Sequence, residues 1–486
     1  MTNNTQETPE ISLLEALIPV FVLISLLAFN VFVFGDNALS GSNQFALLLG
    51  GGVAAILGFR RKIAFTTMMK TVANNIESTS SAIFILLLVG ALSGTWLLSG
   101  IIPAMIYYGL NILSPAIFLP ATVVICSIIS IATGSSWTTS ATVGIALIAI
   151  GNSLGFNLGM VAGAVLSGAY FGDKLSPMSD TTNLAPAMAG TDLFTHIRYM
   201  LYTTVPSIII TIILFTVLGL TQSSKGVVDT SVMQASITEA FNINGWLFIV
   251  PIVVIGLIIK KTEPLVALFA GTLLAAVFAL IWQPNLVVKV GEGSTLDITT
   301  AYRGILNAIT VPSGIETTNA ELADLFSSKG MSGMLNTIWL IICAMFFGGF
   351  MEAIGALHEI SSALMKAAKG VFGLFASTVA SCLALNVTAS DQYLAIVVPG
   401  KMFKKAFKDK GLAPENLSRT LEDSGTVTSV LIPWNTCGAY QSNVLGVDVV
   451  HYLPYAFFNY ISPFMTLIFA AFSIKIKMLT DIPSND

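Results

Sequence analysis

The chain has 486 residues, of which 55% are hydrophobic and only 10% are charged, and its mean hydropathy is +0.83. Soluble domains carry about 25% charged residues, so this composition excludes an ordinary soluble protein and predicts an all-α polytopic membrane protein in the lipid bilayer, with no nucleic-acid partner. The net charge of −4 says little, because the distribution of the charges matters more than their sum.

The sequence carries no signature of an enzyme or of a bound cofactor. The four cysteines are scattered among apolar or small residues without a CxxC pair, which favours packed thiols over a metal site. The three histidines lie at predicted segment ends, where an interfacial role is expected, and form no ligand array. There is no Walker A motif and no recognisable nucleophile with its base. We therefore expect no enzyme and no cofactor, and any transport would draw on an ion gradient.

Apolar segments follow one another along the whole chain, and several are shorter than the roughly 20 residues of a membrane-spanning helix. They lie at about 11–35, 43–59, 77–98, 115–131, 141–151, 157–171, 197–219, 245–259, 264–282, 335–355, 371–385, 392–403, 424–447 and 452–474. The predicted organisation is an N-terminus 1–10, scaffold helices 11–60, a first transport repeat 77–219, a linker 220–244, scaffold helices 245–282, a second linker 283–334, a second transport repeat 335–474 and a C-terminus 475–486.

The basic residues predict the orientation, because cytoplasmic loops of membrane proteins are enriched in lysine and arginine. Clusters occur at 60–70, 260–261, 366–369, 401–410 and 475–477, whereas the linkers 220–244 and 283–334 are poor in basic residues. If both linkers lie outside, every basic cluster lies in the cytoplasm. We therefore expect both termini to be cytoplasmic and the protein to lie in a bacterial-type plasma (inner) membrane.

A polar run, GDKLSPMSDTTNLAPAMAG at Gly172–Gly190, interrupts the apolar pattern. The segment before it is too short to cross alone, and Pro177 and Pro186 interrupt helical hydrogen bonding. Non-helical backbone at membrane depth survives where it lines a cavity or is buried in protein, and ionisable groups there indicate a functional site. The run therefore predicts a broken helix. The alternative is a short helix followed by an ordinary cytoplasmic loop.

The two halves of the chain contain the same order of features at an offset of roughly 250 residues. The segment 101–115 has no basic residue, whereas its counterpart 356–370 has two, so the copies are predicted to be inverted. Each copy then has a re-entrant hairpin, turning at Thr133–Ser140 or Asn386–Asp391, and a broken helix, 157–190 or 419–447. The predicted fold has about ten full crossings, two re-entrant hairpins and two broken helices.

The run GDKLSPMSDTTNLAP, together with GSSWTTSATVG at Gly134–Gly144, resembles the signature of the NhaC family of sodium/proton antiporters. The likeness extends over most of the chain, and the layout resembles the ion-transporter superfamily. The resemblance implies exchange of sodium for protons by alternating access, with an elevator-type domain that moves past a dimeric scaffold. It leaves open sodium- and proton-coupled exchange of small organic acids, of the malate/lactate type. A channel is a third possibility, which the inverted copies disfavour.

Sodium prefers oxygen ligands, and the two hairpin turns and two helix breaks supply them. An antiporter also needs a group that holds either a proton or sodium, and a carboxylate does so if its pKa lies near the working pH. Candidate site residues are Ser135, Ser136, Thr138, Asp173, Asp180, Thr181, Thr182, Asn183, Asn386, Thr388, Ser390, Asp391, Asp423 and Asn435.

Within this set we expect Asp180, Asn183 and Asp391 to bind sodium, and Asp173, Asp180 and Lys174 to couple protons. The sequence leaves one alternative for Asp423, because Glu422 and Arg419 beside it are also typical of a cytoplasmic helix start. We expect no arginine in the site, which mildly disfavours a bidentate clamp for an organic carboxylate.

Overall fold

The computed structural model describes residues 11–34, 41–112, 114–222, 230–260, 262–316 and 326–479. Eight of its helices are long and apolar enough to cross a membrane, or up to ten if each of two bent helix pairs counts as one crossing. The prediction of an all-α polytopic membrane protein is confirmed for the described residues. The candidate crossings include Pro115–Thr133 and Gly370–Thr388, which the sequence places in the two hairpins, so the layout of about ten full crossings plus two re-entrant hairpins stays a prediction. The predicted N-terminus, 1–10, lies outside the described residues.

The first half of the chain consists of two apolar helices followed by a longer series. Helix α3 begins twelve residues before the predicted apolar segment, because the polar stretch 65–76 has neither glycine nor proline to stop a helix. The helices are α1 Leu13–Phe34, α2 Ser42–Arg60, α3 Phe65–Leu98, α4 Ile101–Ile112, α5 Pro115–Thr133, α6 Ser136–Thr139, α7 Ile145–Ser153, α8 Leu158–Leu175, α9 Asp180–Ala189 and α10 Leu193–Gln222.

The middle of the chain contains the predicted linkers and the two apolar helices between them. Its elements are α11 Thr230–Ala240, α12 Ile249–Ile259, α13 Pro264–Trp282, α14 Pro284–Val290, α15 Ile298–Thr310, β1 Ser313–Gly314 and β2 Ser327–Ser328, the strands pairing antiparallel. The second linker is anchored on α3: a Cβ at Gly94 would lie 1.8 Å from the carbonyl oxygen of Ala308. Only glycine permits this approach of two backbones.

The second half repeats the element order of the first: a long helix, a short helix, a helix pair, a broken helix and a final helix. Its helices are α17 Leu335–Ala353, α18 Ala356–Lys366, α19 Gly370–Thr388, α20 Gln392–Asp409, α21 Pro414–Leu421, α22 Thr436–Leu445, α23 Val449–Tyr452 and α24 Phe457–Ala471. Between α21 and α22 the backbone forms a π-helical turn, Glu422–Thr426, and then a 3₁₀ turn, Ser429–Leu431. Such π turns inside helices are frequent at functional sites.

Helix ends occur at matching positions in the two halves, separated by about 256 residues. The turns after α5 and α19 contain a left-handed residue, and the helices that follow are capped by a side chain that accepts a backbone N–H. Both α9 and α22 also begin with such a cap and end at a left-handed glycine. The matching positions are Gly100 with Gly355, Gly134 with Ser390, Ser135 with Asp391, Ser179 with Asn435, and Gly190 with Gly446.

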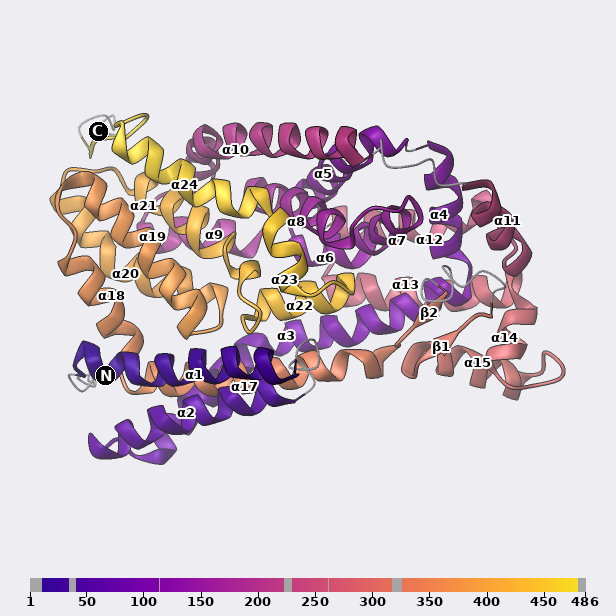
Figure 1. The fold of residues 1–486 in the computed structure, drawn as a ribbon, viewed down its shortest axis with the longest axis horizontal. Coiled ribbons are helices and arrows are strands. Elements are labelled where there is room, and N and C mark those ends of the chain that lie inside the picture. Colours follow the sequence, from indigo (N-terminus) through magenta and orange to yellow (C-terminus); the bar gives the residue numbers. More distant parts are fainter. Residues whose placement is uncertain are drawn as a thin grey trace.

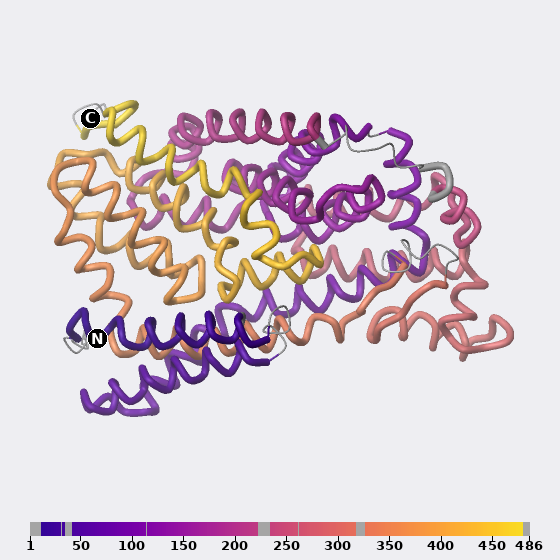
Figure 2. Tube along the Cα trace, viewed as in Figure 1, coloured from indigo at the N-terminus to yellow at the C-terminus, as the bar shows by residue number. Residues whose placement is uncertain are grey.

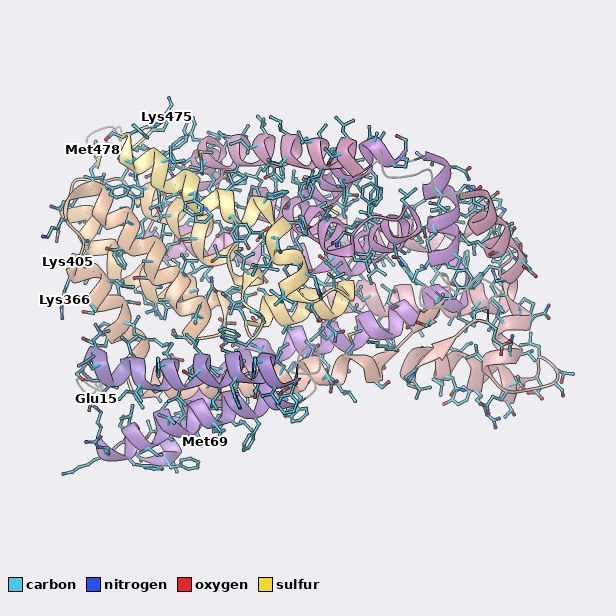
Figure 3. The ribbon with its side chains drawn as sticks, viewed as in Figure 1. Glu15, Met69, Lys366, Lys405, Lys475 and Met478 are labelled. Carbon is cyan, nitrogen blue, oxygen red and sulfur yellow. The ribbon has the colours of Figure 1, made fainter. Side chains whose placement is uncertain are left out.

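The short helices α4 and α18, which follow the matched residues Gly100 and Gly355, lie at opposite ends of the molecule. Figure 1 shows α4 at the same end as α11, α14 and α15, whereas α18 lies at the other end, with α20, α21 and the C-terminal end of the chain. The continuous trace in Figure 2 shows the same separation. Lys366, Lys405 and Lys475 lie together at the α18 end (Figure 3). These three lysines and the described parts of the two linkers are thus at opposite ends, as the charge pattern predicts.

Close packing of α8 on α5 positions the first helix break. A Cβ at Gly168 would lie 2.3 Å from the carbonyl oxygen of Val123, and one at Gly172 would lie 2.5 Å from that of Ser127. Small residues four apart let two membrane helices approach closely. Ser130 adds a hydrogen bond from its hydroxyl to the Ala169 carbonyl at 2.5 Å. The end of α8 is therefore held beside the turn that follows α5.

Candidate functional site

The first helix break contacts the turn of the first hairpin. Helix α8 ends at Leu175, and α9 begins at Asp180 after a segment that contains Pro177. The predicted break in the helix is therefore present, and its depth in the membrane stays a prediction. The Ser136 hydroxyl, directly after the hairpin turn, donates to Oδ2 of Asp173 at 2.7 Å. This hydrogen bond joins residues 37 positions apart in the chain.

A buried ion pair joins the two broken helices. Nζ of Lys174, at the end of α8, contacts Oδ1 of Asp423 in the π-helical turn, and both side chains are fully buried. Three hydroxyls also donate to Asp423: Ser462 to Oδ1 at 3.1 Å, Thr203 to Oδ2 at 2.9 Å, and Thr466 to Oδ2. Buried charges are costly unless paired and hydrogen-bonded, and these contacts satisfy the requirement. We call these five residues the Lys174 network.

A second carboxyl of the π-helical turn points to the first break. The Thr181 hydroxyl, in the first turn of α9, donates to Oε1 of Glu422 at 3.0 Å. Thr181 also lies 3.2 Å, hydroxyl to hydroxyl, from Ser179. Glu422 is fully buried, and its Oε2 has no hydrogen-bond partner in the part of the chain that the structure describes. The two breaks are thus connected at neighbouring positions, through Asp423 and through Glu422.

The second break is held by the turn of the second hairpin. Nδ2 of Asn386 donates to the Gly425 carbonyl at 2.8 Å and to the Thr428 hydroxyl at 3.0 Å. Nδ2 of Asn435 in turn donates to the backbone carbonyl of Asn386 at 3.1 Å. The N–H of Thr436 donates to the Ser390 carbonyl at 3.0 Å. Both predicted pairs of hairpin turn and helix break are therefore in direct contact.

An aromatic contact connects the first hairpin to the second half of the chain. The rings of Trp137 and Tyr440 are stacked with their centroids 3.9 Å apart, and the Tyr440 hydroxyl donates to the Trp137 carbonyl at 3.1 Å. Trp434, by contrast, donates from its indole N–H to the Val387 carbonyl at 2.9 Å. Together with the polar contacts, this stack makes one connected unit of the two turns and two breaks.

Two predicted sodium ligands lie at the surface of this unit. The side chains of Asp180 and Asn183 are exposed. Asn183 donates to the Ser179 carbonyl at 2.7 Å, and Asp180 accepts a long hydrogen bond of 3.5 Å from Tyr393. Asp391 is buried and caps α20 by accepting the N–H of Leu394 at 3.0 Å. The assignment of Asp180, Asn183 and Asp391 to sodium stays a prediction.

The remaining predicted residues make local hydrogen bonds around the turns and breaks. Ser135 caps α6 by accepting the N–H of Thr138 at 3.1 Å. Thr182 donates to the carbonyls of Asp173 and Lys174, both at 3.2 Å, and so ties α9 to the end of α8. Thr388 donates to a carbonyl of its own helix at 2.8 Å. These contacts shape the backbone at the site without deciding which oxygens bind an ion.

Comparisons with known proteins identify the family. Residues 168–474 match the family described as the Na+/H+ antiporter family. The chain is 37% identical to the Na(+)/H(+) antiporter NhaC of Alkalihalophilus pseudofirmus, with 87% of this chain and 89% of the relative covered. The chain belongs to the NhaC-type Na+/H+ antiporter family. This membership confirms the family resemblance seen in the sequence. The NhaC relative is named as a transporter and not as an enzyme.

Relatives of this antiporter family carry names for different exchange reactions. The chain is 36% identical to the malate-2H(+)/Na(+)-lactate antiporter of Bacillus subtilis, with 94% of each chain covered. It is 34% identical to the arginine/ornithine antiporter ArcD of Halobacterium salinarum, with 96% of this chain and 93% of the relative covered. Membership in the antiporter family therefore indicates an exchange transporter, and relatives within the family are named for different substrates.

The structure corrects three sequence-based interpretations of this antiporter. Arg419 and Glu422 are fully buried, so they do not mark a solvated helix start beside Asp423. Arg419, four positions from Asp423, is also a buried arginine that the sequence analysis did not expect near the site. His196 is fully buried and pairs its Nδ1 with the Ser418 hydroxyl at 2.8 Å, instead of lying at an interface. For Arg419 and Glu422 the signal was a charged residue directly beside a predicted break.

Proposed function

We propose that this chain exchanges sodium for protons across the plasma membrane by alternating access. Its family supports the exchange reaction. The observation that carries the proposal is the fully buried ion pair between Lys174 and Asp423, which joins the two helix breaks. Ionisable groups buried at such breaks in a membrane protein mark ion pathways and proton relays.

The buried carboxylates supply the coupling in this proposal. A carboxylate that binds either a proton or a sodium ion, and never both, converts a gradient of one ion into movement of the other. Asp173 is buried and accepts the Ser136 hydroxyl, and Lys174 is paired with Asp423. The proton-coupling groups in the proposal are Asp173, Asp180 and Lys174. Sodium is the substrate, and no cofactor is required.

The proposed motion is an elevator-type displacement of the unit that carries the two turns and two breaks. The matched helix caps and the opposite positions of α4 and α18 support an inverted repeat. Each hairpin turn is hydrogen-bonded to the break of its own half, and the breaks are bonded to each other, which favours movement as one body. The scaffold, including α1, α2, α12 and α13, is proposed to form a homodimer with both termini in the cytoplasm.

The test is exchange by the purified full chain in liposomes that contain a pH-sensitive dye. The proposal requires that sodium added outside alkalinises the lumen, because sodium enters as protons leave, and that an ionophore which collapses the gradient abolishes the response. Protein-free liposomes are the control. Sodium gradients that move no protons in the presence of correctly folded protein would contradict the proposal.

A second candidate function is exchange of small organic acids coupled to sodium and protons. The observation that favours it is the guanidinium of Arg419, which is fully buried and has no hydrogen-bond partner among the described residues on any of its three nitrogens. Arginine binds carboxylates through two parallel hydrogen bonds. In the same liposomes, malate or lactate is added with sodium held constant. Proton movement that depends on either acid would favour this candidate over sodium/proton exchange.

A further inference from the structure

The segment Lys475–Leu479, which follows α24, pairs with the loop between α20 and α21. The two stretches form an antiparallel bridge. The N–H of Leu479 donates to the Gly411 carbonyl at 2.8 Å, and the N–H of Ala413 donates to the Lys477 carbonyl at 3.0 Å. The segment lies at the α20 and α21 end of the molecule (Figure 1). We call it the clamp, because its backbone is bonded directly to the start of α21.

The buried side chain of Asn416 joins the clamp to α10 and α21. Its Oδ1 accepts the Tyr199 hydroxyl at 2.6 Å and the Lys477 N–H at 3.3 Å. Its Nδ2 donates to the carbonyls of Lys477 at 2.7 Å and of Ala413 at 2.9 Å. The Tyr199 hydroxyl also contacts the Lys475 carbonyl. Tyr199 on α10 is therefore tied to the clamp both directly and through Asn416.

Asp423 lies two helical turns beyond Asn416, in the π-helical turn that continues α21. One turn beyond Tyr199 on α10, Thr203 donates its hydroxyl to Oδ2 of Asp423 at 2.9 Å. Between these two levels lies Arg419, whose guanidinium is 4.6 Å from the Tyr199 ring centroid. The same two helices therefore meet at three successive turns. A shift of α21 along or away from α10 at the first level would lengthen the hydrogen bond to Asp423 at the third.

We propose that the clamp positions Asp423: through Asn416 and Tyr199 it holds α21 against α10 and so keeps Asp423 on the Thr203 hydroxyl. Asn416 and Tyr199 are positioning residues in this inference, since they touch neither Lys174 nor Asp423 with a polar atom. The inference rests on the proposed sodium/proton exchange for its effect on transport, because Asp423 is the ion-pair partner of Lys174.

The charged and titratable groups that face Asp423 come from the helices packed around it and from its own turn. They are Lys174 of α8, His196 of α10, Arg419 of α21, Glu422 of the π-helical turn and Cys382 of α19, which lies beside that turn. The point substitutions that test the clamp leave all of these groups in the chain. A changed pH dependence in those variants therefore reports a change in the hydrogen bonds of Asp423.

The test is the pH profile of exchange by the full chain in liposomes. Tyr199→Phe removes the hydroxyl bonded to the clamp and keeps the ring beside Arg419, whereas Thr203→Val removes the hydroxyl on Asp423 directly. An ionised carboxylate that loses a hydrogen bond holds its proton to a higher pH, so both variants should raise the pH of half-maximal exchange on the acidic side by at least about half a unit. The double variant should shift it no further than Thr203→Val alone, because both changes act on one contact.

Tyr202→Phe is the matched control, since it makes the same change on the same helix. The Tyr202 side chain is 43% exposed, and its hydroxyl makes no hydrogen bond with the described residues. This variant should keep the wild-type pH profile. Deleting residues 475–486 removes the clamp and should shift the profile as Tyr199→Phe does, whereas deleting 480–486 keeps every contact of the clamp and should not. A wild-type profile in Tyr199→Phe would overturn the proposal even if the longer deletion does not fold.

Hydrogen–deuterium exchange separates the clamp from the proposed function, because it needs no transport. In detergent, the backbone amides of residues 414–426 should exchange at least about threefold faster in Tyr199→Phe than in the wild type or Tyr202→Phe. A chain that moves no protons but shows this difference loses the exchange reaction and keeps the clamp. Equal amide rates in the three proteins would refute the clamp whatever the transport result. Faster amides with an unchanged pH profile would make the segment a structural brace and remove its role for Asp423.

Discussion

Two buried basic side chains, Lys174 and Arg419, are stabilised in different ways. Lys174 is paired with a carboxylate. The guanidinium of Arg419 lies 4.6 Å from the ring centroid of Tyr199 and 5.8 Å from that of Phe469. Aromatic faces attract a cation by up to about 2 kcal/mol when water is excluded, but they leave its N–H groups unbonded. Lys174 is therefore satisfied, whereas Arg419 keeps its hydrogen-bonding capacity.

The ion pair of the Lys174 network should be a strongly coupled unit. We expect Lys174→Gln or Asp423→Asn alone to destabilise the protein by about 3–5 kcal/mol, because each leaves an uncompensated buried charge. The double variant should lose clearly less stability than the sum of the stability losses of the two single variants. Thermal unfolding of the four proteins in detergent measures the cycle. Additive losses would show that the two side chains do not interact.

The two aspartates of the first break should differ in importance. Asp173 is buried and bonded to Ser136, whereas Asp180 is exposed and makes one long hydrogen bond. We expect Asp173→Asn to abolish sodium-driven proton movement in liposomes and Asp180→Asn to reduce it by a smaller factor. Both variants should express at wild-type levels. Near-normal exchange by both would contradict the assignment of these carboxylates.

At the scale of elements, glycines decide how closely helices approach around the site. The backbones of α5 and α8 come together at Gly168, where an added Cβ would lie 2.3 Å from a carbonyl oxygen. Carbonyls are fixed in the helix backbone and cannot swing away as a side chain can. The close contact sets the position of the α8 end, and therefore of Asp173 relative to the hairpin turn.

Gly168→Ala should consequently destabilise the protein and weaken exchange. The expected loss is about 1–3 kcal/mol, because the extra methyl forces the two helices apart. Gly256→Ala is the matched control: it is also inside a helix, α12, but its added Cβ meets nothing within 4 Å. That substitution should be neutral or stabilising by up to about 1 kcal/mol. Equal melting temperatures of the two variants would argue against the close-packing explanation.

At the scale of the whole molecule, the basic clusters and the linkers lie at opposite ends (Figures 1 and 3). This separation predicts the side of the membrane on which each surface residue lies. The four native cysteines are all buried, so new cysteines report position against a low background. This prediction concerns the orientation of the protein in the membrane, which the fold by itself does not determine.

A cysteine at Ile298, on the linker helix α15, should react with an impermeant thiol reagent added to intact cells. A cysteine at Lys405, on α20, should react only after the membrane is made permeable, because the positive-inside rule places it in the cytoplasm. Both wild-type side chains are exposed, at 90% for Ile298. The reverse labelling pattern, or labelling of both from outside, would contradict the proposed orientation.

Competition between sodium and protons should appear as a pH dependence of the whole transporter. Protons that occupy the carboxylates must leave before sodium binds, so the apparent sodium affinity falls as the pH falls. Below the pH at which the site loses its protons, each further drop of one pH unit should weaken the apparent sodium affinity about tenfold per displaced proton. Calorimetry of sodium binding at several pH values measures the slope. An affinity independent of pH over about two units around the working range would rule out direct competition.

The sequence by itself determined the membrane class, the order of helices and the positions of the two breaks. These features depend on local signals: apolar length, proline and glycine, and polar runs such as Gly172–Gly190. The chain also encodes the turns of both hairpins, since Gly134 and Ser390 lie in the left-handed region where the helices reverse. Each of these signals acts within a few residues and needs no partner elsewhere in the chain.

Only the tertiary structure decided which charges meet. Lys174 and Asp423 lie 249 positions apart, and their contact depends on how the two broken helices pack. The same is true of Glu422, whose neighbour Arg419 made a solvated helix start an equally good interpretation of the sequence. Burial is a property of all the surrounding helices together. A charged residue beside a break can therefore be located from sequence, but its partner and its exposure follow only from the packed fold.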